Sequence, residues 1–120
     1  MTETQFTSRL TKALRKQLGP YHIVWKHADG YTAGIPDISI NWGGNTLWIE
    51  VKLASNPKIF EPLQVAMLRK LDGHYVIWDT KTRLGCRFSY VIAPDHGQVI
   101  PVELRHNFDA LVQNILNEVS

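Results

Sequence analysis

Two stretches of alternating apolar and polar residues flank a pair of adjacent glycines at positions 43–44. Adjacent glycines between such stretches are typical of a β-hairpin with a two-residue turn. If these glycines form the turn, Trp42 pairs with Asn45, and counting outward places Asp37 directly opposite Glu50. The pattern therefore predicts a hairpin whose far end brings two carboxylates together.

The two faces of this predicted hairpin differ in polarity, because successive side chains of a strand point to opposite faces. One face is apolar and is the predicted core face; it collects Ile38, Ile40, Trp42, Leu47, Ile49, Val51 and Leu53. The other face is mostly polar; it collects Asp37, Ser39, Asn41, Thr46, Trp48, Glu50 and Lys52. Two carboxylates and one amine thus share a face.

Apolar residues at helical spacing predict helices over residues 2–18, 62–71 and 107–119. Thr2 with Gln5 three positions later indicates a capping box at the start of the first helix, and Asn107 is the predicted N-cap of the last. Further strands are predicted at 21–27 and 74–79, with a second hairpin formed by 88–93 and 99–104. The polar segment 80–87 is predicted to be a loop. This order of helices and strands predicts an α/β fold with a mixed central β-sheet flanked by helices.

Composition narrows the class of protein. The 120 residues suit one domain spanning 1–120, and the net charge of +2 permits nucleic-acid binding without requiring it. The single cysteine, Cys86, excludes an intrachain disulfide and suits a reducing cytoplasm. No apolar run approaches the roughly 20 residues that span a bilayer, and no signal-peptide core is present. We therefore expect a cytoplasmic protein without a membrane partner.

The opposed carboxylates are the strongest candidate for chemistry. Directly opposed residues of antiparallel strands have Cβ atoms roughly 4.5–5.5 Å apart, and like charges at that distance destabilise a sheet. A divalent cation such as Mg²⁺ would offset the repulsion between Asp37 and Glu50, because it prefers oxygen ligands. With the amine of Lys52 nearby, such a set suits phosphodiester hydrolysis. The ordinary alternative is a solvated polar face.

The same residues resemble a known signature. Pro36-Asp37 followed, thirteen positions after the aspartate, by Glu50-Val51-Lys52 resembles the motif of the PD-(D/E)XK nuclease superfamily. The residue pattern at positions 34–37 and 48–52, with Gln64 in the next predicted helix, is similar to that of the VRR-NUC branch. This branch includes small stand-alone phage proteins. The resemblance covers roughly residues 3–79.

This resemblance implies a restriction-endonuclease-like core and a Mg²⁺- or Mn²⁺-dependent DNA endonuclease, in a bacterium or a phage-infected cell. It implies that Asp37 and Glu50 hold the metal, with the Val51 carbonyl as a further ligand. By the same analogy Lys52 positions the attacking water, Gln64 supports the site, and Glu3 is a third acidic group.

Glu3 and Gln64 also have ordinary explanations. A carboxylate in the first turn of a helix is favourable against the helix dipole without any further role, which suffices for Glu3. Gln64 shares a helical face with Leu68 and Leu71, so it is expected to point inward, where backbone groups could satisfy its amide. Both alternatives remain open at this stage.

Candidate contacts to nucleic acid are scattered along the chain: Lys26, His27, Tyr31, Lys58, Lys81 and Arg83. Each of these side chains could equally be solvated surface. A small domain with one site would cut two strands as a homodimer, which makes branched DNA or a Holliday junction a plausible substrate. The competing hypotheses are a catalytically silent nucleic-acid-binding or assembly module on the same fold, and a nuclease that cleaves RNA.

Overall fold

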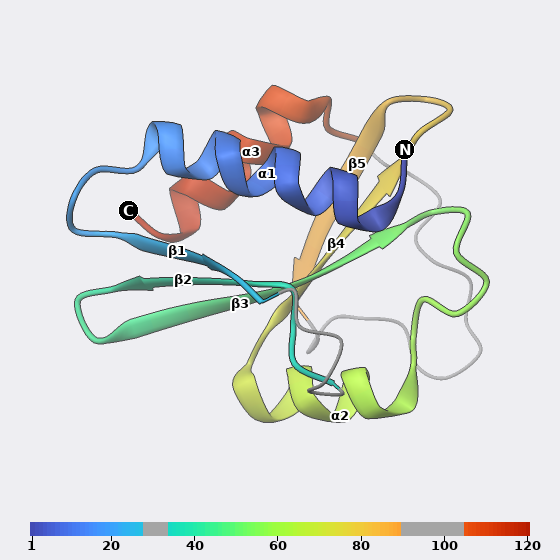
Figure 1. Cartoon of the computed structure of the whole chain (residues 1–120), viewed down its shortest axis with the longest axis horizontal. Coiled ribbons are helices and arrows are strands. Elements are labelled where there is room, and N and C mark those ends of the chain that lie inside the picture. Colours follow the sequence, from blue (N-terminus) through green and yellow to red (C-terminus); the bar gives the residue numbers. More distant parts are fainter. Residues whose placement is uncertain (28–33, 90–104) are drawn as a thin grey trace.

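The computed structural model describes residues 1–27, 34–89 and 105–120. Within these residues the elements follow one another as α1 (Glu3–Gln17), β1 (Ile23–Lys26), β2 (Ile38–Trp42), β3 (Asn45–Leu53), α2 (Pro62–Leu71), β4 (His74–Asp79), β5 (Leu84–Ser89) and α3 (Phe108–Glu118). Figure 1 shows α1 and α3 on one side of the sheet and α2 on the other. None of the helices in these ranges has the length and apolar character required to span a bilayer.

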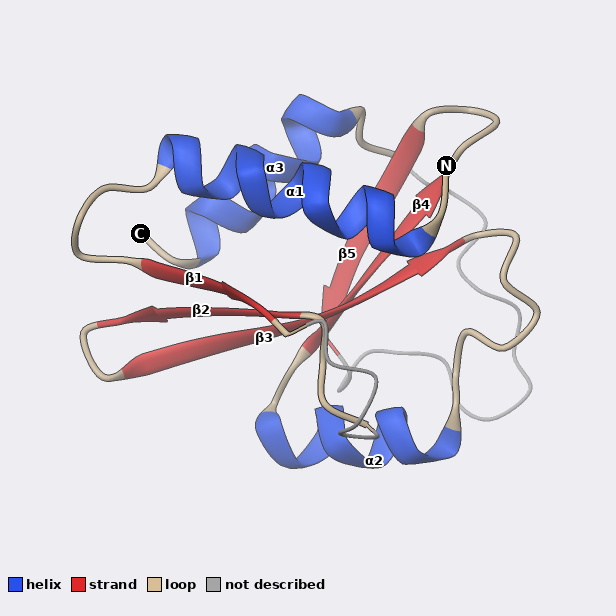
Figure 2. Ribbon diagram, in the orientation of Figure 1, coloured by secondary structure: helices blue, strands red, loops and turns tan. Residues whose placement is uncertain are grey.

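The strands form one sheet in the order β1-β2-β3-β4-β5. Neighbouring strands are antiparallel except β3 and β4, which run parallel and are connected through α2 (Figure 2). A parallel pair needs such a crossover, whereas an antiparallel pair can be joined by a tight turn. The predicted α/β class with a mixed sheet between helices is confirmed.

The register of the central hairpin is confirmed as well. Trp42 pairs with Asn45 beside the turn, and the ladder continues to Ile38 paired with Ile49. The turn glycines at positions 43 and 44 have φ values of 50° and 81°. A two-residue turn whose central residues both have positive φ matches the right-handed twist of the flanking strands, and glycine adopts it without steric penalty.

The main core lies between the sheet and the pair α1 and α3. Its helical side comes from Phe6, Leu10 and Leu14 of α1 and from Leu111, Val112 and Ile115 of α3. Its sheet side includes the predicted core face of the hairpin, with Ile38, Ile40, Leu47, Ile49, Val51 and Leu53 all buried. Thr2 and Gln5 form the capping box at the start of α1, and the Asn107 side chain caps α3, both as predicted.

A second, smaller core lies under α2 on the opposite face of the sheet; it contains Ile59, Leu68, Tyr75, Ile77 and Phe88. This packing buries part of the face that was predicted to be polar. Ser39, Glu50 and Lys52 are all buried there, so a fully solvated hairpin face is ruled out for these three residues. The carboxylate of Glu50 is consequently held away from bulk water.

Two predicted segments differ from the structure, and a third lies mostly outside the described residues. The strand predicted at 21–27 is shorter, because its partner β2 ends at the turn and β1 begins only at Ile23, opposite Asn41. The predicted loop at 80–87 is wrong beyond residue 83, since β5 pairs there with β4. Most of the predicted second hairpin falls at residues 90–104, outside the described residues.

Candidate active site

Asp37 lies immediately before β2, at the end of the hairpin remote from the turn. Its carboxylate Oδ2 accepts a hydrogen bond of 2.8 Å from the backbone N–H of Val51 in β3. Its backbone carbonyl accepts one of 2.7 Å from the N–H of His27, which extends the contact between β1 and β2 by one pair. These two bonds hold the Asp37 carboxylate against the middle strand.

Pro36 explains why a side chain rather than the backbone meets this N–H. Continuing the hairpin register places Pro36 opposite Val51, and proline has no N–H to donate to the Val51 carbonyl. The N–H and C=O of one strand residue point to the same neighbouring strand. The Val51 carbonyl therefore points to the edge of β3 where Asp37 lies, and β2 cannot pair with it. The sequence Pro36-Asp37 therefore places the Asp37 carboxylate and the Val51 carbonyl oxygen side by side.

Glu50 is the second carboxylate, and only 2% of its surface is exposed. Its Oε2 atom makes no hydrogen bond to any of the described residues. Burial raises the pKa of Glu50 from 4.5 to about 10; the carboxyl group of Asp37, which hydrogen-bonds to it and repels its charge, acts in the same direction. This raised pKa favours the protonated form of Glu50 at neutral pH when no cation is bound.

Lys52 follows two residues later on the same face and is also buried, with 6% of its surface exposed. Its positive charge lowers the pKa of Glu50 and so opposes the larger effect of burial. A buried ammonium beside two carboxylates is favourable only while a negative charge remains near it. The positive charge of Lys52 therefore stabilises negative charge on the carboxylates of the site.

These residues fit a hard divalent cation. The donors are carboxylate oxygens and one carbonyl oxygen, and the unpartnered Glu50 Oε2 supplies a buried acceptor that a cation would satisfy. No group of three or more His, Cys, Asp and Glu side chains able to hold a metal occurs among the described residues. Two carboxylates suit Mg²⁺, which keeps several of its waters, better than a metal held entirely by protein ligands.

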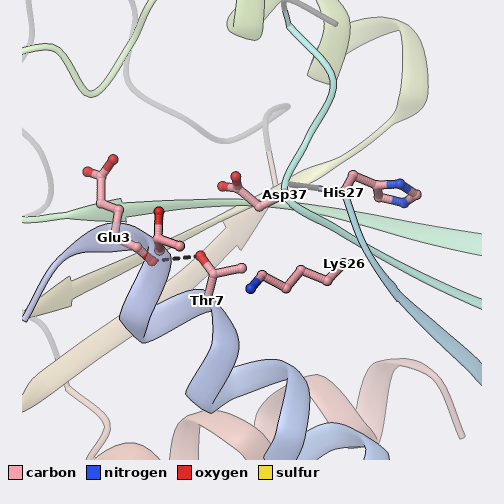
Figure 3. Close-up of a pocket in the computed structure, with 6 residues that line it drawn as sticks. Glu3, Thr7, Lys26, His27 and Asp37 are labelled. Atoms are coloured by element: carbon pink, nitrogen blue, oxygen red, sulfur yellow. Dashed lines mark hydrogen bonds between the residues drawn. The ribbon is translucent and has the colours of Figure 1, made fainter. Parts of the chain in front are cut away.

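A pocket of about 110 Å³ opens beside Asp37, between α1 and the sheet; it is lined by Glu3, Thr4, Thr7, Lys26, His27 and Asp37. Figure 3 shows the amine of Lys26 directed toward α1 and the ring of His27 turned away from Asp37 and Glu3. The Lys26 amine donates a hydrogen bond of 2.6 Å to Ser8 Oγ. Lys26 thus faces the pocket, whereas His27 faces the other side of the sheet.

Glu3 joins α1 to the end of β3. Its Oε2 atom accepts hydrogen bonds from the Leu53 backbone N–H, at 2.9 Å, and from the Asn56 side-chain amide, at 2.7 Å. Its charge also raises the pKa of Glu50, so it lies within electrostatic reach of the carboxylate pair. The geometry therefore gives Glu3 a structural role, and its predicted role as a metal ligand stays a prediction.

Replacement of Glu3 separates these two roles. Because Glu3→Ala leaves the N–H of Leu53 without its acceptor, we expect it to lower the free energy of unfolding by about 1–3 kcal/mol in urea titrations. Glu3→Gln keeps a side-chain oxygen and should lose less. An alanine variant as stable as the wild-type protein would contradict the structural role; a glutamine variant that is stable but no longer stabilised by Mg²⁺ would favour the metal ligand.

His27 and its neighbours form a contact that the sequence did not reveal. The His27 ring nitrogen Nε2 lies 2.7 Å from Ser39 Oγ, and its ring centroid lies 5.4 Å from that of Trp48. Alternation along the hairpin had placed Ser39 and Trp48 on the face of Glu50. That shared face was the one indication in the sequence that these two residues could lie beside His27. The Asn56 amide that supports Glu3 lies in a turn and had no such signal.

The remaining predicted site residues differ in their exposure. The Gln64 Oε1 atom is buried without a hydrogen-bond partner among the described residues, which confirms that Gln64 points inward. Lys58 and Lys81 are exposed, and Arg83 lines a separate pocket with Met1 and Arg9. Tyr31 lies outside the described residues.

Comparison with known proteins supports the fold. No protein-family model matches the sequence, and no curated protein matches it. The structure is similar to that of Hjc, a Holliday junction resolvase from the archaeal hyperthermophile Archaeoglobus fulgidus solved at 1.6 Å resolution. The TM-score is 0.62 and the sequence identity 19%, over 92% of this chain and 98% of that chain. The chain therefore has the predicted restriction-endonuclease-like α/β fold.

Proposed function

We propose that this protein is a Mg²⁺- or Mn²⁺-dependent endonuclease that hydrolyses phosphodiester bonds in DNA, with selectivity for branched DNA. The single observation that carries the proposal is the pair Asp37 and Glu50, brought together at the end of the hairpin with one buried oxygen unpartnered among the described residues. A fold built only for stability gains nothing from two opposed carboxylates. The structural likeness to a resolvase of junctions supports the same class of substrate.

In this proposal Asp37, Glu50 and the Val51 carbonyl hold the cation. When bound, the cation supplies electrostatic stabilisation of the charge that develops on the phosphate oxygens. Glu50 can act as a ligand only in its deprotonated form. Burial raises the pKa of Glu50, and the positive charge of a bound cation would lower it again. The residues at positions 34–37, Gly-Ile-Pro-Asp, favour assignment to the VRR-NUC branch, and so does Gln64.

Lys52 provides the remaining chemistry from the protein itself. Its buried ammonium lies on the face of Glu50 and orients the attacking water by a hydrogen bond, while its charge favours the more negative transition state. Gln64, from α2, would support this arrangement through its buried Oε1 atom, which has no hydrogen-bond partner among the described residues. Because the proposal gives each chain one such site, cleavage of two strands of a junction calls for a homodimer.

The test is a cleavage assay on labelled single-stranded DNA, linear duplex, flap, splayed arm and four-way junction, each with Mg²⁺, Mn²⁺ or EDTA. We expect metal-dependent cuts, strongest on branched DNA and lost in Asp37→Asn, since the amide withdraws one anionic ligand. Thermal unfolding of the same variant without metal confirms that it is folded. If DNA is bound but no substrate is cut under any condition, the silent binding module on the same fold is correct instead.

A further inference from the structure

One half of the sheet face that carries Glu50 is open and largely aromatic. Tyr21, just before β1, is 86% exposed, and Ile23 and Trp25 within β1 are 53% and 54% exposed. The intervening Val24 is buried in the main core, so the two exposed strand residues point to the opposite face. Isolated exposed apolar residues are common, but three large ones within five positions of one segment mark an interaction surface.

Cross-strand pairing shows what lies beside these side chains. Trp25 pairs with Ser39, which pairs with Trp48, so these three residues form one row across β1, β2 and β3. Ile23 pairs with Asn41, which pairs with Thr46, in the row toward the turn. We call the six residues Tyr21, Ile23, Trp25, Asn41, Thr46 and Trp48 the open aromatic face.

The open aromatic face runs directly into the candidate active site. The next row along the strands holds His27 and Asp37, and on β3 it holds Glu50, two residues after Trp48. Two residues of a strand span roughly 7 Å. The His27 ring packs on Trp48 and links the two rows. Among the described elements, α2 lies beneath the other half of this face (Figure 1).

The chemistry of the face indicates its ligand. None of its six residues is charged, and its acidic neighbours are the two carboxylates that would hold a cation. Flat aromatic rings beside amide and hydroxyl groups suit a planar ligand with polar edges. They suit an aliphatic partner surface less well. Bases of a single strand stack on such rings irrespective of sequence, because every base has a π-face.

We propose that the open aromatic face binds unpaired nucleobases of a strand whose backbone enters the site at Asp37 and Glu50. The inference rests on the proposed function and deepens it, because it names the part of a branched substrate that the protein would recognise: the unstacked bases at the branch. Trp25 and Trp48 provide the stacking surface, and Asn41 and Thr46 provide polar contacts at its rim. A second copy seated here would lie beside the carboxylates and compete with the substrate, which is why we favour a nucleic-acid strand.

The test measures binding without cleavage, in EDTA, of a short oligothymidylate and of an oligonucleotide of the same length whose central residues are abasic. We expect Trp25→Leu to weaken binding of the oligothymidylate about tenfold, while binding of the abasic strand changes little. Trp25→Phe should recover most of the loss, because it restores a ring. Trp42→Leu is the matched control, since Trp42 lies on the opposite face of the same hairpin and stacks on His22.

Unchanged binding in Trp25→Leu, or an equal loss on both oligonucleotides, would overturn the proposal. Sedimentation of the same variants identifies the alternative: a wild-type dimer that dissociates in Trp25→Leu without any base-dependent loss assigns the face to a second copy. Cleavage by the wild-type protein is measured in parallel. If the wild-type protein cuts DNA but shows no base-dependent loss, only the role of this face fails; if it neither binds nor cuts, the proposed function fails.

Discussion

Lys52→Met is expected to lower the rate of DNA cleavage by at least about a hundredfold while leaving the protein folded. Methionine fills the buried space of the lysine stem, so the packing around β3 is retained. What disappears is the ammonium group, which in our proposal orients the attacking water and favours the more negative transition state. The loss should therefore appear in the cleavage rate at saturating substrate rather than in DNA binding.

Single-turnover cleavage of the preferred substrate, with DNA binding measured separately, checks this expectation. Lys70→Met is the matched control, because Lys70 is an exposed lysine in the last turn of α2. Circular dichroism of both variants establishes that they are folded. A Lys52→Met enzyme with full activity would exclude Lys52 from the chemistry and leave the two carboxylates and the cation as the catalytic groups.

The carboxylate pair predicts an unusual pH dependence of stability. The pKa of Glu50 is about 10 in the folded protein, compared with the ordinary value of 4.5. The folded state therefore holds one more proton than the unfolded state between these values, and linkage requires metal-free stability to fall as pH rises across that interval. The slope is at most about 1.4 kcal/mol per pH unit, or roughly 5 °C in Tm for a domain of this size.

Glu50→Gln should remove this slope and raise the Tm of the metal-free protein in alkaline solution. Thermal unfolding in EDTA from about pH 7 to about pH 8.5 measures the effect, because this range lies above the ordinary pKa of histidine and below that of cysteine. Burial lowers the pKa of His74 and raises that of Cys86, so both groups contribute mainly outside that range. Glu61→Gln, at the N-cap of α2, is the matched control.

Mg²⁺ provides the complementary measurement. A cation would replace the proton on Glu50, so its binding should release a proton and become tighter as pH rises. Wild-type protein is then expected to gain Tm on addition of Mg²⁺, by an amount that increases with pH, whereas Glu50→Gln gains little. A wild-type Tm that is flat over this pH range, and insensitive to Mg²⁺, would contradict both the buried proton and the metal site.

The sequence predicted the hairpin well because its signals are local. The glycines at positions 43 and 44 determine the turn, the turn determines the register, and the register places Asp37 beside Glu50. The caps of α1 and α3 were also predicted, since each depends on residues within one turn of the helix. The register and the caps were confirmed because each depends on residues close together in the chain.

Features that depend on distant partners were missed. The segment that forms β5 contains a glycine and an arginine and reads as a polar loop. In the structure Gly85 pairs with His106, and Arg87 Nε donates a hydrogen bond of 2.6 Å to Asn114 Oδ1 in α3. Likewise, alternation along the strand predicted at 21–27 puts Ile23 and Trp25 on one face, but alternation does not indicate whether a helix covers that face. These outcomes follow from tertiary packing, which overrides local preference.

The two-residue turn allows the hairpin to vary in length without changing which residues meet at the site. Cross-strand pairs between the turn and Asp37 can be added or removed two at a time, because the two kinds of pair alternate and the two-residue turn closes on a hydrogen-bonded pair; Asp37 then still meets Glu50. A single inserted residue, by contrast, exchanges the two faces of one strand and sends its carboxylate into the core. In related chains that keep the two-residue turn, the interval from the aspartate to the glutamate should therefore change in steps of four, with the outer end of the hairpin free to lengthen along the substrate.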